Sequence, residues 1–485
     1  MSAEPARPCD CSTTRRSLMR GGFVGRPWHW LSGLAVLACL VNPVRAIAQT
    51  ARPEPLTLND AIQAALKSYP AIKERRARAQ AAEEAVAVAR TAYLPRLDMV
   101  WQVNRATTNN VFGLLLPQSI VPPISGPVLG TRSYDGVWGS AAGVLLSWEA
   151  VDFGQRKAGV EVARAQTSLA KAQMALTELD VASAAADAFL TVLAADEGVR
   201  AARANVDRLQ VFANAVRTLT QNQLRPGADQ SRAEAELAVA RNQLSQANQV
   251  ADLARAALAD AIGAAGASPQ LVAGPLTTLP DVTTGPVDVK SHPAAQAGEA
   301  SVDAVRARER GLDRAYYPTV TVESAFAGRG TGADVPGIPS LGTGLWPHVP
   351  NWALGASVRF AAFDLFAINA RKRVEAQNDL AESARYEQTI QNLTTQDAKA
   401  RALLKAATEI ARNTPVEREA ATAGESQARA RYQSGLASVT EVAEAQRLLA
   451  QAEADDAVAR LGVWRALLAA AQARGDLTSF VDKIK

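Results

Sequence analysis

The chain is an internal tandem repeat, and this feature constrains its fold more than any other. Two prolines of the first half recur in the second half at one constant spacing, since Pro70 matches Pro293 and Pro95 matches Pro318. Five later positions recur at a second, shorter spacing: Asp152 with Asp364, Asp229 with Glu441, Ala233 with Ala445, Leu237 with Leu449 and Gly263 with Gly475. We call this second spacing the hairpin spacing. Two constant spacings indicate one duplication in which a single connection has become shorter in the second half.

Both halves have the same predicted order of elements. The first repeat, 49–275, has a helix over 58–90, a strand pair at about 97–107 and 137–150, and a long helical hairpin at about 155–262. The second repeat, 276–485, has a helix over 291–314, a strand pair at about 319–327 and 351–362, and a hairpin at about 366–475. Pro95 and Pro318 end the first helix of each half, because proline cannot continue a helix.

The predicted strands alternate between apolar and polar residues. In the first strand the apolar positions are Leu97, Met99, Trp101 and Val103, and the same alternation covers 319–327 and 351–362. Period two predicts strands with one oily face and one wet face. Strands of about ten residues cross a bilayer when tilted, and Trp148 and Trp352 are expected at its interfaces. The Gly- and Pro-rich segments 117–132 and 328–350 are expected to be loops facing the outside of the cell.

The hairpins show heptad patterns. One seam of the first long helix has Val162, Leu169, Leu176 and Leu190, and alanines are frequent in the other seam. Such seams predict helices that supercoil around each other, with alanine allowing close approach. A helix over 156–223 is ~100 Å long at ~1.5 Å per residue. No globular core needs a helix of that length.

Four strands cannot close a barrel, and lipid would not satisfy the open edges of two hairpins. Several chains must therefore share one barrel, and three copies give about twelve strands, a size that occurs in nature. The predicted fold class is mainly α with a transmembrane β portion. Tandem-duplicated coiled-coil hairpins accompany the strands, and each chain contributes four strands to a shared 12-stranded trimeric β-barrel.

Residues 1–48 have the features of a secretory signal peptide. A basic segment precedes a short apolar run over 31–41, and Ala46-Ile47-Ala48 provides a small-x-small cleavage site. Export by the general or by the twin-arginine route stays open, because the n-region contains Arg15-Arg16. Lipidation at Cys39 also stays open.

Removing this segment changes the charge balance and the available chemistry. Of 52 basic and 48 acidic residues, six and two lie in 1–48, which leaves 46 of each. A neutral mature chain gives no support to nucleic-acid binding. All three cysteines lie in 1–48, and only His292 and His348 remain afterwards. We therefore expect no metal site, no cofactor and no catalytic residues.

Four motifs resemble the TolC-like outer-membrane efflux family. They are LTLNDAI at 56–62, YLP at 93–95, DFG at 152–154 and RYQSGL at 431–436, and the resemblance covers about 56–476. It implies a homotrimer in outer-membrane lipid with a helical tunnel in the periplasm. It also implies that this tunnel docks with a periplasmic adaptor (membrane fusion) protein and an inner-membrane pump.

The resemblance also implies roles at the periplasmic tip. Asp229, Glu441 and Glu444 match acidic positions near a closed aperture, and Tyr432 matches a tyrosine that helps to latch it. Ala437 falls where the best-known member has an arginine. The hairpin tips expected to meet the adaptor are Leu224, Arg225, Pro226, Gly227, Gly435, Leu436, Ala437 and Ser438.

The leading function is passive export through a duct that its partners gate at the periplasmic tip. The alternative is a periplasmic coiled-coil adaptor or scaffold protein without a membrane barrel, since adaptors also contain long heptad hairpins. The oily strand faces favour the duct, because a scaffold has no use for them. Drugs, solvents, metal ions and secreted polypeptides all use this fold, so the cargo stays open.

Overall fold

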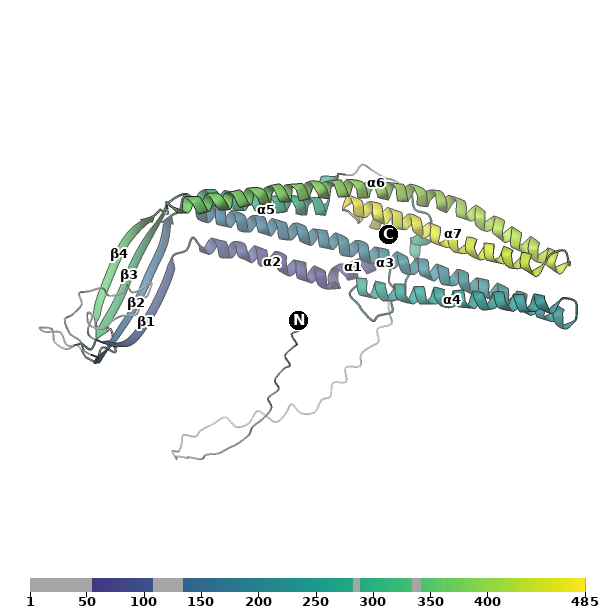
Figure 1. The fold of residues 1–485 in the computed structure, drawn as a ribbon, viewed down its shortest axis with the longest axis horizontal. Helices are drawn as coiled ribbons and strands as arrows, with labels where there is room; N and C mark the ends of the chain where they lie inside the picture. Colours follow the sequence, from purple (N-terminus) through teal and green to yellow (C-terminus); the bar gives the residue numbers. More distant parts are fainter. Residues whose placement is uncertain (1–54, 108–133, 282–287, 334–341, 361, 485) are drawn as a thin grey trace, which may run out of the picture. The chain divides into compact units, whose positions relative to one another are not determined.

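The computed structural model describes residues 55–107, 134–281, 288–333, 342–360 and 362–484, which belong to one compact unit, Pro53–Lys485. The first repeat contains α1 (Leu58–Ser68), α2 (Pro70–Thr91), β1 (Arg96–Thr107), β2 (Gly136–Val151), α3 (Gln155–Gln221) and α4 (Gly227–Ala261) (Figure 1). The second contains α5 (Pro293–Arg314), β3 (Thr319–Thr331), β4 (Val349–Arg359), α6 (Asp364–Gln433) and α7 (Val439–Arg474). Three short helices, η1 (Gly274–Thr277), η2 (Val289–Ser291) and α8 (Thr478–Val481), complete the set. The predicted signal segment 1–48 and loop 117–132 lie outside the described residues.

The helix predicted over 58–90 is two helices. Thr57 and Asp60 form a capping box at the start of α1, with the Asp60 amide donating to Thr57 Oγ1 at 3.2 Å. Tyr69 then adopts an extended conformation (φ −64°, ψ 129°), and Pro70 opens α2. The prediction of one helix is wrong here because the residue before a proline is driven out of the helical region.

Strand β3 is longer than predicted. It continues to Thr331, through residues that were expected to begin the loop 328–350, and β4 begins at Val349 and ends at Arg359. The Gly-Arg-Gly sequence at 328–330 is therefore strand, and its glycines meet a loop segment that crosses the sheet.

The four strands form one antiparallel sheet in the order β1-β2-β3-β4. The register places Met99 opposite Val144, Val144 opposite Phe326, and Phe326 opposite Trp352. Because paired residues point to the same side, the oily faces of all four strands coincide. This apolar sheet face consists of Leu97, Met99, Trp101, Val103, Val144, Leu146, Trp148, Val320, Val322, Phe326, Trp352, Leu354 and Val358.

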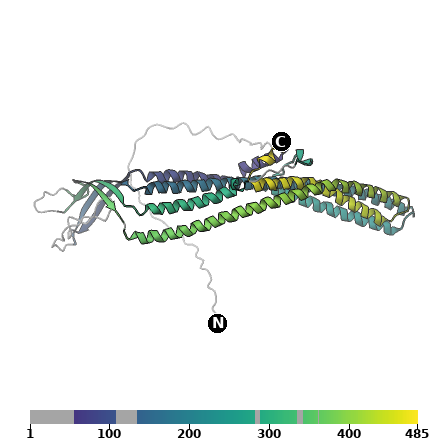
Figure 2. The same ribbon diagram turned by 90° about the horizontal axis from the view of Figure 1, so that it is seen from above.

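The helices form a layer in the same order as the strands. Near the sheet, α2, α3, α5 and α6 lie side by side in that order, and towards the hairpin turns the order is α4, α3, α7 and α6 (Figures 1 and 2). The long helices α3 and α6 therefore run through both parts of the layer. In the part near the hairpin turns, α4 takes the position that α2 has near the sheet, and α7 takes the position of α5. The predicted fold class is confirmed for the single chain: mainly helical, with two long hairpins and four antiparallel strands.

In each repeat, a glycine at the hairpin spacing lies where the end of one helix meets the start of another: the end of α4 meets the start of α2, and the end of α7 meets the start of α5. Gly263 and Gly475, a pair at the hairpin spacing, end α4 and α7 with φ of +70° and +80°. A Cβ at Gly263 would lie 3.2 Å from the Ser68 carbonyl carbon, beside Pro70, and one at Gly475 would lie 2.6 Å from Pro293 Cδ. Each position requires glycine for two reasons: the backbone is left-handed at the end of the helix, and the neighbouring helix start lies too close for a side chain.

His292 fixes the second of these junctions. It is buried, its Nδ1 accepts from the Ala294 amide at 3.0 Å, and its Nε2 lies 3.1 Å from the Gln472 carbonyl oxygen. Burial lowers the pKa of the imidazole, so the ring is neutral near pH 7 and Nε2 carries the proton. His292 thus caps α5 and joins it to the end of α7.

The largest buried cluster lies around this middle region. It includes Phe189 of α3, Trp464 of α7, Phe480 of α8 and Leu276 of η1. Trp464 contacts Phe480 edge-on, with ring centroids 6.2 Å apart, and its indole N–H donates to the Thr278 carbonyl at 2.9 Å. No helix among the described residues is both long and apolar enough to cross a membrane.

The junction generates a prediction about two glycines near the end of α7. Gly475→Ala places a Cβ 2.6 Å from Pro293 at a positive φ, so we expect a loss of about 1–3 kcal/mol of unfolding free energy. Gly462→Ala is the matched control, since its Cβ meets nothing within 4 Å and alanine favours a helix interior by about 1 kcal/mol. Denaturant unfolding followed by circular dichroism checks both, and equal stability of the two variants would contradict the junction.

Candidate functional site

The predicted site residues lie at two hairpin turns, α3–α4 and α6–α7, far from the sheet along the helices (Figure 1). The turns have the same backbone geometry. Gly435 has φ +76° and Leu436 donates to the Arg431 carbonyl at 2.8 Å, while the repeat-equivalent Gln223 has φ +61° and Leu224 donates to the Leu219 carbonyl at 2.9 Å. The tip residues are exposed except for Arg225, which is half-buried, and Ala437, which is buried.

The helices leaving the turns begin differently. Ser438 caps α7 in a capping box with Glu441, whose amide donates to Ser438 Oγ at 3.3 Å while its carboxylate accepts from the Ser438 amide at 3.2 Å. The equivalent residue at the start of α4 is Pro226, which has no side-chain oxygen to offer. Asp229 is therefore not held by a capping box, and its carboxylate acts on Tyr432 instead.

Tyr432 joins the two hairpins. Its ring is buried at 3% exposure and packs edge-on against Phe212 of α3, with centroids 5.5 Å apart. The Arg225 guanidinium lies 4.5 Å from the ring centroid, and its Nη2 donates to the Tyr432 carbonyl at 2.7 Å. A cation over an aromatic face with a charged hydrogen bond holds the α3–α4 turn against the end of α6. We call Arg225 and Tyr432 the tip clasp.

Arg225 is a functional candidate whose role the motif comparison missed. It was expected only among the adaptor-contacting residues, and the arginine of the best-known relative was sought at Ala437. Arg225 is the repeat equivalent of Ala437, because the two are separated by the hairpin spacing. Applying the hairpin spacing to Ala437 therefore identifies Arg225 from the sequence.

The Tyr432 hydroxyl is buried, with no hydrogen bond of ordinary geometry to the described residues. Burial first, and then the negative charge of Asp229, raise the pKa of this hydroxyl, while Arg225 acts in the opposite direction. The phenol therefore remains protonated near pH 7 and is a hydrogen-bond donor. The Asp229 carboxylate is the acceptor that this donor faces.

Glu441 and Glu444 are exposed and each faces an arginine of its own chain. Arg431 Nη1 lies 4.0 Å from Glu441 Oε2, and Arg447 Nη2 lies 2.5 Å from Glu444 Oε1. Such exposed pairs contribute little to stability. Their role at an aperture stays a prediction, because an aperture is a property of an assembly.

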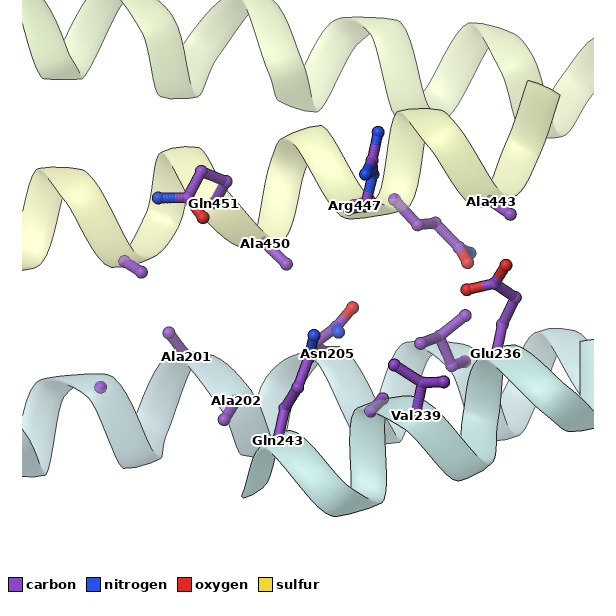
Figure 3. Close-up of a pocket in the computed structure, with 15 residues that line it drawn as sticks. Ala201, Ala202, Asn205, Glu236, Val239, Gln243, Ala443, Arg447, Ala450 and Gln451 are labelled. Carbon is purple, nitrogen blue, oxygen red and sulfur yellow. The ribbon is translucent and has the colours of Figure 1, made fainter. Parts of the chain in front are cut away.

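A groove lies above the tips, between the α3–α4 hairpin and α7 (Figure 3). Its cavity volume is about 240 Å³, and many of its walls are alanines, among them Ala202, Ala443 and Ala450. Asn205 and Gln446 also line the groove. The two residues are buried, at 8% and 1% exposure, and Asn205 Oδ1 and Gln446 Oε1 have no hydrogen-bond partner among the described residues. Glu236 and Arg447 line the groove from opposite helices, and the Glu236 carboxylate points into the space between them (Figure 3). In the described part of the chain, no three His, Cys, Asp or Glu side chains are grouped to hold a metal ion.

Comparisons with known proteins agree with this architecture. The family model described as Outer membrane efflux protein matches residues 61–264 and 289–476, whereas no curated protein matches the chain in sequence. Among solved structures, the Campylobacter jejuni CmeC outer membrane channel has a TM-score of 0.70 at 14% identity, covering 86% of this chain and 85% of that one. The open state of the Neisseria gonorrhoeae MtrE outer membrane channel has a TM-score of 0.69 at 19% identity, with 86% and 89% covered. The outer membrane protein VceC from Vibrio cholerae has 0.68 at 17% identity, with 86% and 96% covered.

The structural likenesses show the fold, and the family model shows the relationship, because it matches both repeats and most of the chain. The resemblance seen in the sequence motifs is confirmed. So are the non-enzymatic nature of the chain and its place in the outer membrane with a helical tunnel in the periplasm. The chain belongs to the outer membrane efflux protein family.

Proposed function

We propose that this chain is the passive exit duct of a tripartite efflux or secretion system. Three copies form one channel, which the periplasmic adaptor and the inner-membrane pump open at the tips. The observation that carries the proposal is that the apolar sheet face and the helix layer end at the same two open edges. A periplasmic scaffold would need neither an apolar sheet face nor matched edges.

The exposure of the apolar sheet face supports a membrane span. Met99 is 76% exposed, Leu354 70% and Trp352 80%, so these parts of the face have no cover among the described residues. Along β2, Trp138 and Trp148 are ten residues apart, about 33 Å of strand. At a tilt of about 40° this corresponds to ~25 Å, the height of the apolar band in outer-membrane barrels.

The open edges support assembly into a ring. Among the described residues β1 pairs only with β2, and β4 only with β3. The helices α2 and α4 lie at the β1 edge and α6 at the β4 edge. Exposed apolar residues occur on these edge helices: Val250 and Leu253 on α4, and Leu380, Leu403 and Ile410 on α6. Two different edges that complement each other form a head-to-tail interface, which closes into a ring, and three copies provide twelve strands.

The groove above the tips supports adaptor docking. Alanine walls let a partner helix approach closely, and the polar side chains of Glu236, Gln243 and Arg447 line the groove beside them. We therefore place adaptor contact at the groove as well as at the tip residues predicted from the sequence.

The first prediction tests the assembly. Leu403→Arg puts a charge into the proposed interface and should shift the trimer towards monomers, as measured by light scattering in mild detergent. Val211→Arg is the control, because Val211 is also exposed, at 61%, but belongs to α3, which has neighbours on both sides. A parent chain of monomeric mass would refute the duct and favour the scaffold.

The second prediction concerns the groove. Ala450→Trp fills it and should weaken adaptor binding by at least about tenfold, ~1.4 kcal/mol, in co-purification from the native host. Leu448→Trp on the same helix is the control, since Leu448 is exposed and does not line the groove. Single-channel conductance of both variants should equal that of the parent. Unchanged adaptor binding by Ala450→Trp would remove the groove from the docking surface.

The third prediction concerns the aperture. In a trimer Asp229, Glu441 and Glu444 become rings of three like charges, which attract cations in a constriction. Replacing Glu441 and Glu444 together by alanine should weaken cation selectivity and block by multivalent cations in planar bilayers. Arg225→Ala and Tyr432→Phe should instead raise the open fraction, the former because it removes the tip clasp. If the double alanine variant keeps the parent's selectivity, the two glutamates are ordinary solvated charges.

A further inference from the structure

A loop segment crosses the apolar sheet face at the end of the sheet away from the helices. This segment, residues 342–348, is called the strap. It lies on three alternating glycines at the end of β3: Gly328, Gly330 and Gly332. An added Cβ at these glycines would be 2.9, 2.1 and 2.6 Å, respectively, from atoms of the strap. Gly328 pairs with Ala142, which pairs with Trp101 of the apolar sheet face, so the strap lies on that side. The glycines therefore form a track that only a missing side chain allows.

The two ends of the strap lie close to the strands. Near its start, an added Cβ at Gly344 would be 2.1 Å from the Trp138 carbonyl oxygen. The His348 amide donates to the Arg329 carbonyl at 2.9 Å. Gly342 and Gly344 have φ of +110° and +79°, conformations that direct the chain back across the sheet. The strap thus has a defined path.

The strap presents apolar groups outwards. The Trp346 ring packs edge-on against Trp101 of β1, with centroids 5.0 Å apart, yet the two side chains remain 68% and 58% exposed. Leu345 is 37% exposed, and residues 342–348 contain no Asp, Glu, Lys or Arg. A segment that only covered the sheet from water would turn its polar groups outwards, and this one extends the apolar surface.

We propose that the strap is a lipid anchor, in which Leu345 and Trp346 insert at the boundary between acyl chains and headgroups of the outer leaflet. The inference rests on the proposed membrane span. Indole rings favour this boundary because they are apolar with one polar N–H. Arg105, whose guanidinium lies 5.8 Å from the Trp138 ring centroid on the same side, adds a cation that suits lipid phosphate. The strap fixes the depth of the sheet in the bilayer.

The experiment uses single cysteines in the full-length protein, because the three natural cysteines all lie in residues 1–48, within the predicted signal segment. Trp346→Cys is labelled with an environment-sensitive fluorophore, and trimers are reconstituted into phosphatidylcholine vesicles with or without spin-labelled lipid. Trp352→Cys reports on the apolar sheet face, and Tyr134→Cys, at a fully exposed residue, reports on water. We expect lipid quenching at 346 within about twofold of that at 352, and aqueous iodide quenching only at 134.

The outcomes separate the anchor from the duct. Iodide quenching at 346 with lipid quenching at 352 would overturn the anchor and leave the membrane span intact. Iodide quenching at both positions would overturn both proposals. Loss of conductance on modifying Cys at 346 with a charged thiosulfonate would place the strap in the channel and also overturn the anchor. Gly330→Ala in the Trp346→Cys chain should at least halve lipid quenching, because its Cβ would occupy the space of the residue 346 carbonyl. If that variant does not assemble, the quenching of the label at position 346 in the Trp346→Cys chain alone decides whether the strap is an anchor.

Discussion

Within the described part of the chain, the outer edges of β1 and β4 have no strand partner, and this is the constraint on which the architecture depends. In lipid each unpaired backbone N–H or C=O group costs several kcal/mol, so the sheet is incomplete as a single copy. The helix layer ends at the same two edges because each strand continues into one of its helices. In the proposed assembly, one head-to-tail contact between copies would satisfy the strands in the membrane and bury the exposed apolar residues of the edge helices below it. Duplication makes this possible, since two similar units side by side present complementary rather than identical edges.

The two hairpins match in register but differ in chemistry. Asp456 of α7 is buried and accepts from Arg418 Nη1 at 2.8 Å and from Thr414 Oγ1 at 3.4 Å. At the matching positions, one hairpin spacing earlier, the first hairpin has Leu244, Val206 and Ala202. Pro415 interrupts the hydrogen bonding of α6 beside this cluster. At these positions the first hairpin has apolar side chains, whereas the second has a buried carboxylate that depends on Arg418 and Arg460, because an unpaired buried charge is strongly destabilising.

Local patterns predicted the fold well where one physical signal decided the outcome. The alternation from Leu97 to Val103 gave the correct strand face, because the face is set by period two alone. The break at Tyr69 was missed because the apolar pattern continues through it and only the Tyr69–Pro70 geometry interrupts the helix. The strap was missed for a related reason, since glycines at 328–332 were interpreted as loop and not as a track for another segment. At the tips, the positions followed from the motifs, but the pairing of Arg225 with Tyr432 joins residues 207 apart and depends on how the hairpins pack.

The charges of the tip illustrate how one chain prepares an assembly. Glu441 and Glu444 each lie near an arginine of their own chain, so rings built from them carry less repulsion than six bare carboxylates would. Asp229 instead shares the surroundings of Tyr432 with Arg225, and there the guanidinium is already engaged with the ring and carbonyl of that tyrosine. Displacing Arg225 would free the α3–α4 turn from α6 and remove one cation from the surroundings that Tyr432 shares with Asp229. Separation of the hairpins and growth of negative charge at the tip are therefore coupled through a single arginine.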